Sequence, residues 1–129
     1  MTDTARTTVG LSDGAHGKLQ RLKEDGYFSE MADGYRFAIA LAIAHGAIAP
    51  PPVGGRQTIF NLGTLDQDGT ITAAVRALRE RSDEPVHRTL ERLAEWGVEE
   101  LYRRVEEGHL SFAEILAEAE GLTGERPRL

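Results

Sequence analysis

The spacing of apolar residues predicts a short strand and a first helix at the start of the chain. Residues 7–11, Thr-Thr-Val-Gly-Leu, alternate polar and apolar side chains and include β-branched residues, which is typical of a half-buried strand. Residues 13–24 then carry apolar side chains at helical spacing, and Ser12 is of the residue type that caps helix N-termini. The dipeptide Asp25-Gly26 ends this helix.

A second helix is expected from Ser29, as its N-cap, to about His45, with Gly46 as its stop. Residues 37–44 in its second half, Phe-Ala-Ile-Ala-Leu-Ala-Ile-Ala, include no polar side chain. A helix that is apolar all round must be covered all round, so we expect this run at the centre of the fold or in a dimer core. The alternation would also suit a strand, but alanine favours helix over strand.

Prolines and glycines separate this first part from the rest of the chain. Residues 50–57 contain three prolines, which are extended, and two glycines, which are permissive, and they therefore predict a linker. Residues 58–62 have the composition of a short strand. Residues 66–69, Asp-Gln-Asp-Gly, predict a turn that leads into a helix N-cap, because Ala77 stands where a calcium loop needs glutamate.

The remainder of the chain has helical periodicity. A third helix is predicted for residues 70–81, and a fourth runs to Gly108 with a kink at Gly97. Residues 111–114, Ser-Phe-Ala-Glu, form a capping box, in which the first and last side chains bond the helix N-terminus. They open a last helix with two apolar residues inside, Ile115 and Leu116.

Together these elements predict a mainly α protein with a short N-terminal strand, a helix pair and a C-terminal helical part. We expect a strand–helix–helix unit at residues 1–49 and a Pro/Gly linker at 50–57. An acidic helical part at 58–120 and a flexible tail at 121–129 follow. A chain of 129 residues is long enough for one ordinary domain with a core.

Charge is unevenly spread along the chain. Residues 1–57 carry six basic and six acidic side chains, whereas residues 58–129 carry nine and fifteen, which accounts for the net charge of −6. The acidic half is a poor surface for nucleic acid, because phosphate binding needs a positive footprint. We therefore expect that half to face a protein or solvent.

Composition also limits the chemistry. The chain has no cysteine, which excludes disulfides, thiol nucleophiles and thiolate metal sites. No two of its four histidines share a helix face at metal-ligand spacing, and its Glu99–Arg103 and Glu100–Arg104 pairs suit a solvated helix. We expect no enzyme activity, no catalytic, cofactor or metal site and no small-molecule substrate. No signal segment or membrane-length apolar run is visible, so a cytoplasmic location is expected.

The N-terminal pattern resembles the ribbon-helix-helix family of DNA-binding proteins. The matching segments are residues 7–11, 13–24 and 29–31 (Ser-Glu-Met), and the resemblance covers about residues 5–46. It implies a homodimer whose paired strands enter the DNA major groove and whose second helices anchor phosphates at their N-termini. Carried over to this chain, the DNA-contact candidates are Arg6, Thr8 and Ser29. The candidates for the dimer interface or core are Val9, Leu11, Phe37, Ile39, Leu41 and Ile43.

Residues 35–42, Tyr-Arg-Phe-Ala-Ile-Ala-Leu-Ala, are similar to the apolar second helix of small DndE-type proteins. These are accessory subunits of bacterial DNA-sulfur-modification and defence systems. The resemblance implies an accessory role in antiviral defence and assigns no individual residue.

We therefore predict a non-enzymatic, DNA-associated regulatory or accessory protein that acts as a dimer or within a larger complex, with duplex DNA as a candidate partner. The alternative is a pure protein-interaction subunit of a bacterial multi-protein, defence-type system without DNA contact.

Overall fold

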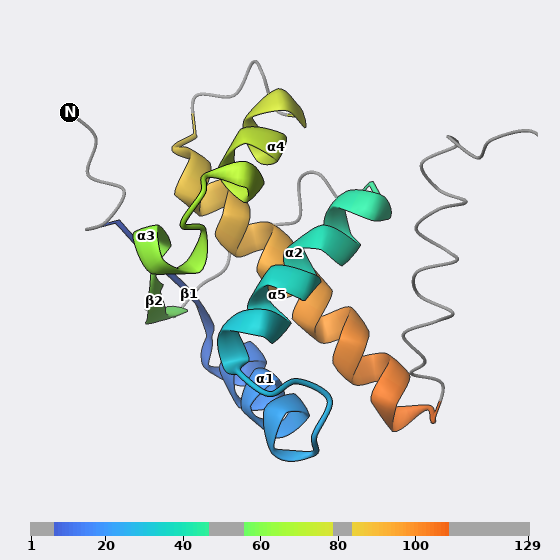
Figure 1. Ribbon diagram of the computed structural model, residues 1–129. Helices are drawn as coiled ribbons and strands as arrows, with labels where there is room; N and C mark the ends of the chain where they lie inside the picture. Colours follow the sequence, from blue (N-terminus) through green and yellow to red (C-terminus); the bar gives the residue numbers. More distant parts are fainter. Residues whose placement is uncertain (1–6, 47–55, 79–83, 109–129) are drawn as a thin grey trace, which may run out of the picture.

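The computed structural model describes residues 7–46, 56–78 and 84–108, and within them the predicted mainly α class is confirmed (Figure 1). Arg6, most of the predicted linker, the predicted helix from Ser111 and the tail lie outside these ranges. The elements in chain order are β1 (Thr8–Ser12), α1 (Asp13–Glu24), α2 (Met31–Ala44), β2 (Arg56–Asn61), α3 (Leu62–Leu65), α4 (Thr70–Leu78) and α5 (Val86–Glu106).

The chain passes directly from β1 into α1 at the predicted cap. The Ser12 hydroxyl oxygen accepts a hydrogen bond from the Ala15 N–H at 3.2 Å, which satisfies one of the free donors at the helix N-terminus. The helix ends as expected before Gly26, whose φ of 89° is accessible to glycine at little cost. The predicted boundaries of the first helix are confirmed.

β1 and β2 form an antiparallel two-stranded sheet in which Leu11 lies opposite Gln57 and Val9 opposite Phe60. A bulge interrupts the register between Val9 and Gly10. β2 begins two residues before the predicted strand, and Leu62, expected in that strand, instead starts the single turn of α3. The backbone bond from Leu62 N–H to the Thr7 carbonyl, at 2.7 Å, holds the start of α3 against the start of β1.

The long helix α5, rather than α2, is the element that contacts most of the others, since it packs against α1, α2, α4 and β1. Figure 1 shows α2 crossing α5, and the two helices come closest at Ala38 and Gly97. A Cβ atom at Gly97 would lie 2.1 Å from the Ala38 carbonyl oxygen. α5 runs without interruption through Gly97, where a kink was predicted, and the glycine allows the close helix crossing.

One hydrophobic core joins the elements on both sides of the predicted linker. From the N-terminal part, Leu19 and Ile39 are at most 1% exposed, and from the C-terminal part, Leu90 and Val98 are fully buried. Among the described residues, β1, α1 and α2 therefore share their core with α5, which packs against all three.

Candidate functional site

The apolar run of α2 divides into a buried face and an outer face. Ala38, Ile39, Leu41 and Ala42 are at most 3% exposed and pack in the core. The other four residues of the run are half-buried or, for Ala40, exposed, although none of them is polar. We call these four residues the outer face of α2: Phe37, Ala40, Ile43 and Ala44.

Aromatic contacts lie at both ends of this outer face. At its beginning the rings of Phe28 and Phe37 lie 5.8 Å apart, and at its end the rings of His45 and Trp96 lie 5.7 Å apart. Trp96 belongs to α5 and is half-buried, so it continues the apolar surface from one helix to the other. At its C-terminal end the outer face of α2 therefore lies near an aromatic side chain of α5.

The helices α1 and α5 present charged side chains instead. Lys18 of α1 pairs with Glu99 of α5 at 2.5 Å, and this carboxylate raises the pKa of the lysine. Further along α5, Glu100 accepts bonds from Arg103 at 2.6 Å and from Arg104 at 2.8 Å. The predicted Glu100–Arg104 pair is thus confirmed, while Glu99 pairs with Lys18 rather than with Arg103. A solvated helix surface normally has such charges, and their absence from the outer face of α2 sets that face apart.

Both edges of β1 are occupied within the chain. One edge pairs with β2, and on the other the Gly10 N–H donates to Glu91 Oε2 at 2.9 Å. The Tyr35 hydroxyl donates to the Gly10 carbonyl at 3.0 Å, and Glu95 accepts bonds from the Ser12 N–H and hydroxyl at 3.1 and 2.7 Å. Side chains from α2 and α5 thus take the positions that a second strand would fill.

The occupied edges of β1 leave no room for the pairing of two N-terminal strands that the ribbon-helix-helix resemblance implies. Ribbon pairing needs a free edge on the N-terminal strand, and the edge of β1 opposite β2 holds Tyr35, Glu91 and Glu95 instead. Val9 and Leu11, which were candidates for a dimer interface or core, are at most 1% exposed inside the single chain. They therefore serve the core of one chain.

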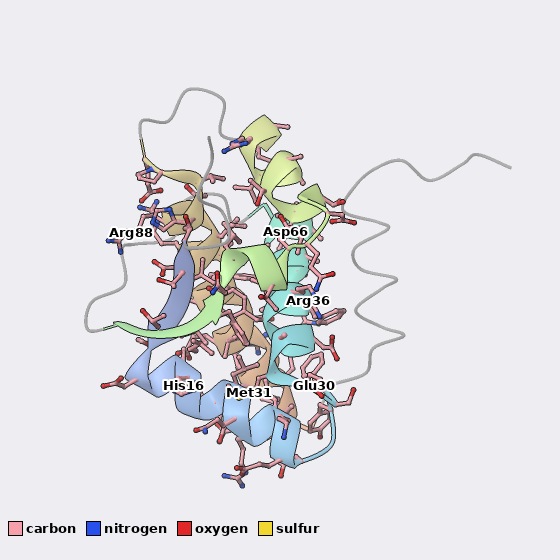
Figure 2. All side chains as sticks on the ribbon, turned by 60° about the vertical axis from the view of Figure 1, so that its left-hand side comes forward. His16, Glu30, Met31, Arg36, Asp66 and Arg88 are labelled. Carbon is pink, nitrogen blue, oxygen red and sulfur yellow. The ribbon has the colours of Figure 1, made fainter. Side chains whose placement is uncertain are left out.

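The DNA-contact candidates do not form one surface in the described residues. Arg6 lies outside the described ranges, Thr8 is half-buried at the start of β1, and Ser29 is exposed. The prediction that Ser29 caps the second helix is wrong, because Glu30 holds the N-cap position. Figure 2 shows Glu30 on the side of the molecule away from β1. Asp33 is also in the first turn, so two carboxylates, of which Asp33 is paired with Arg36, lie near the position where a phosphate would bind.

A hollow of about 520 Å³ lies between α2 and the turn that joins α3 to α4. Arg36, which Figure 2 shows beside Asp66, donates to the Leu65 carbonyl and to Asp33, both at 2.8 Å. Asp66 is 5% exposed and accepts bonds from the Ile71 N–H at 3.0 Å and from the N–H and hydroxyl of Thr72. These bonds fasten α4 and α2 to the turn, so Arg36 and Asp66, which both line the hollow, have structural partners.

The same turn confirms the prediction for residues 66–69. The Thr70 N–H donates to Asp68 Oδ1 at 3.0 Å, and this bond holds the pKa of the Asp68 carboxyl below its usual value. Asp66 and Asp68 thus cap the start of α4. In the part of the chain that the structure describes, no three acidic or histidine side chains are grouped as metal ligands.

The sequence gives no signal for the bonds that Tyr35 and Glu91 make to the backbone of Gly10. Tyr35 lies in an apolar helix, and Glu91 has neighbours of mixed polarity along the chain. Glu91 is 3% exposed in the fold, with Arg88 Nη1 at 3.6 Å. Its bond to Gly10 spans 81 positions of sequence, and no local pattern encodes such a pairing.

Among the described helices, none has both the length and the apolar composition that a membrane span requires. No protein-family model matches the chain, and comparison with curated proteins and with solved structures found no similar protein.

Proposed function

We propose that this protein is a non-enzymatic protein-interaction subunit that docks through the outer face of α2. The observation that carries the proposal is the set of apolar side chains at Phe37, Ala40, Ile43 and Ala44, on a helix whose opposite face is already buried. Covering such a face with an apolar partner removes it from water and stabilises a complex. A cytoplasmic, defence-type accessory role, as the DndE-type similarity implies, fits this proposal.

Two features favour a protein partner over DNA. Glu30 and Asp33 place negative charge at the start of α2, where a phosphate anchor would need attraction. The edge of β1 that would pair with a second ribbon is filled by side chains of the same chain. Neither feature opposes docking on the outer face of α2, which is made of uncharged residues.

Site-specific photocrosslinking in the native cell tests the proposal. A photoreactive residue in place of Ala40 should give a discrete protein adduct, because Ala40 is exposed at the middle of the outer face. Ala77 on α4 is an exposed helical alanine on another element and is the matched control, at which no adduct is expected. An adduct between two copies of this chain would show that the partner is a second copy and that the complex is a homodimer. Equal crosslinking at both positions, or none at either, would overturn the proposal.

The DNA-associated alternative has its own measurement. A duplex-DNA mobility shift that weakens steeply with rising salt would show phosphate contact. We expect no shift at low salt. A shift that is lost on removing the charge of Arg6 would instead support DNA association.

A further inference from the structure

We propose that the hollow between α2 and the turn from α3 to α4 receives a lysine or arginine side chain of the protein that docks on the outer face of α2. This inference rests on the proposed function, because it specifies the chemistry of the partner at that same surface. The partner then combines an apolar surface with a basic residue beside it.

The outer face of α2 leads directly to the hollow. Arg36 lines the hollow and lies four residues before Ala40, which is exposed at the middle of the outer face. Residues four apart share one face of a helix, with Cβ atoms about 5–6 Å apart. Figure 2 shows Arg36 beside Asp66, on the far wall of the hollow. A partner that covers Ala40 is therefore within side-chain reach of the hollow.

The hollow has an excess of negative charge. Among the described residues that line it, Arg36 is basic, whereas Asp66 and Asp68 are acidic. The Arg36 guanidinium already donates to the Leu65 carbonyl and pairs with Asp33 at 2.8 Å, so its positive charge is offset outside the hollow. The N-terminus of α4 offsets only about half a charge more. A cation is therefore favoured in the hollow over an anion.

Asp68 is the accessible one of the two carboxylates. Its side chain is exposed, whereas Asp66 is only 5% exposed and accepts bonds from Ile71 and Thr72. The bond from the Thr70 N–H holds the pKa of the Asp68 carboxyl below its usual value, so this group is ionised at neutral pH. A basic head group that enters the hollow can pair with Asp68 directly and is attracted by the buried charge of Asp66 as well.

The remaining lining suits a long basic side chain. Leu65 and Ile71 line the hollow with aliphatic groups, and Thr64, Gln67 and Thr70 line it with polar ones. Lysine and arginine carry a charged head on an apolar stem, so they bury the stem along apolar surface while the head stays among polar groups and water. The hollow, of about 520 Å³, has room for such a side chain together with water.

The basic residue acts mainly on selection and orientation of the partner. An exposed ion pair contributes little affinity, whereas charges at the rim of an interface steer association and fix its register. The apolar contact at Ala40 supplies the area buried from water, and the pairing at Asp68 determines which end of the partner lies over the start of α2.

Asp68→Asn tests the inference, because the amide keeps an oxygen that can accept the Thr70 N–H bond and removes only the charge. We expect the yield of the photocrosslink from position 40 to fall about two- to fivefold, the range for an exposed ion pair. Asp68→Lys reverses the charge and should lower the yield further. Asp13→Asn removes an equal charge from an exposed aspartate in the first turn of α1 and is the matched control, with unchanged yield.

A second measurement uses the purified natural chain without its partner. Butylammonium chloride, which has the end group of lysine, should shift the amide NMR signals of residues 64–71 in a saturable manner. Sodium butyrate at the same ionic strength should not. In Asp68→Asn, which circular dichroism should show to be folded, butylammonium should bind about twofold more weakly or less.

An undiminished crosslink in Asp68→Asn would overturn the inference and leave the proposed function standing. Butyrate shifts as large as those with butylammonium, or no shift with either, would do the same. The absence of any adduct from position 40 in the otherwise natural chain would overturn both the proposed function and the inference.

Discussion

Gly97 determines how closely the two main helices approach each other. Its missing side chain leaves room for the Ala38 backbone, with carbonyl oxygen, carbonyl carbon and Cα all within 2.6 Å of the place a Cβ would occupy. Gly17 in α1 has no atom within 4 Å of the corresponding position. Two glycines that look alike in the sequence thus have opposite structural requirements.

Replacing Gly97 by alanine should destabilise the fold by at least about 3 kcal/mol, because overpacking against backbone is costlier than against a mobile side chain. Gly17→Ala should be neutral or gain up to about 1 kcal/mol, since alanine is the better helix former. Urea unfolding of both variants measures the difference. A Gly97→Ala protein as stable as the natural chain would refute the close crossing.

At the scale of single elements, α5 carries the electrostatic contribution that is easiest to isolate. The hydrogen bond from Arg103 is the largest cause that lowers the pKa of Glu100, and Arg104 adds to it against the opposing effect of partial burial. A carboxyl with a lowered pKa in the folded state stabilises the fold above its unfolded pKa of about 4.3. That stabilisation is lost as the pH falls through the lowered, folded value.

We therefore expect Glu100→Gln to cost about 0.5–1 kcal/mol at neutral pH, for two helix-surface pairs of which one is partly buried. The difference in free energy of unfolding between the variant and the natural chain should disappear in acid, below the folded pKa of Glu100. Urea unfolding at several pH values measures this, with Glu106→Gln as the control, since Glu106 is exposed further along the same helix. An equally large difference in free energy of unfolding in acid would show that the ionised Glu100 carboxylate is not the source of the stabilisation.

The sequence predicted those elements whose signals are local. Ser12, Asp25-Gly26 and Asp66–Gly69 act over a few residues, and the elements that they begin or end lie close to the predicted positions. The predicted start of α2 is one residue too early, because Ser29 is the better cap by residue type but Glu30 holds the N-cap position. The Gly97 contact and the bonds of Glu91 join distant segments, so neither has a local signal.

The sequence predicts that residues 37–44 form an apolar helix, but not which of them make up the outer face of α2. The run from Phe37 to Ala44 showed that apolar residues surround the helix, but the sequence could not show which four would face the core. That depends on where α5 crosses, and the crossing is set by Gly97, 59 residues after Ala38 in the sequence.

At the scale of the whole molecule, the described residues share one hydrophobic core across the predicted linker. β1 and α1 precede the linker, yet their buried residues pack against α5 and the sheet is completed by β2. Unfolding of such a shared core should occur in a single transition.

A fragment of residues 1–49 should accordingly fail to fold alone, because α5 and β2 are missing from its core. Circular dichroism and thermal unfolding of this fragment measure the outcome, and mixing it with a fragment of residues 50–129 should restore helical signal. A cooperative thermal transition of the first fragment by itself would show that residues 1–49 form an independent domain.

The hydrogen bonds from β1 to side chains of α5 also determine when, during synthesis, the backbone of β1 can be satisfied. Gly10 is joined to Glu91 and Ser12 to Glu95, across 81 and 83 positions of sequence. During synthesis the first strand therefore leaves the ribosome long before the carboxylates that satisfy its backbone. Until about residue 95 has emerged, the N-terminal strand has an open edge, and a nascent chain in this state is a natural client for chaperones. The final structure of the strand is thus set late, by one of the last described segments to be made.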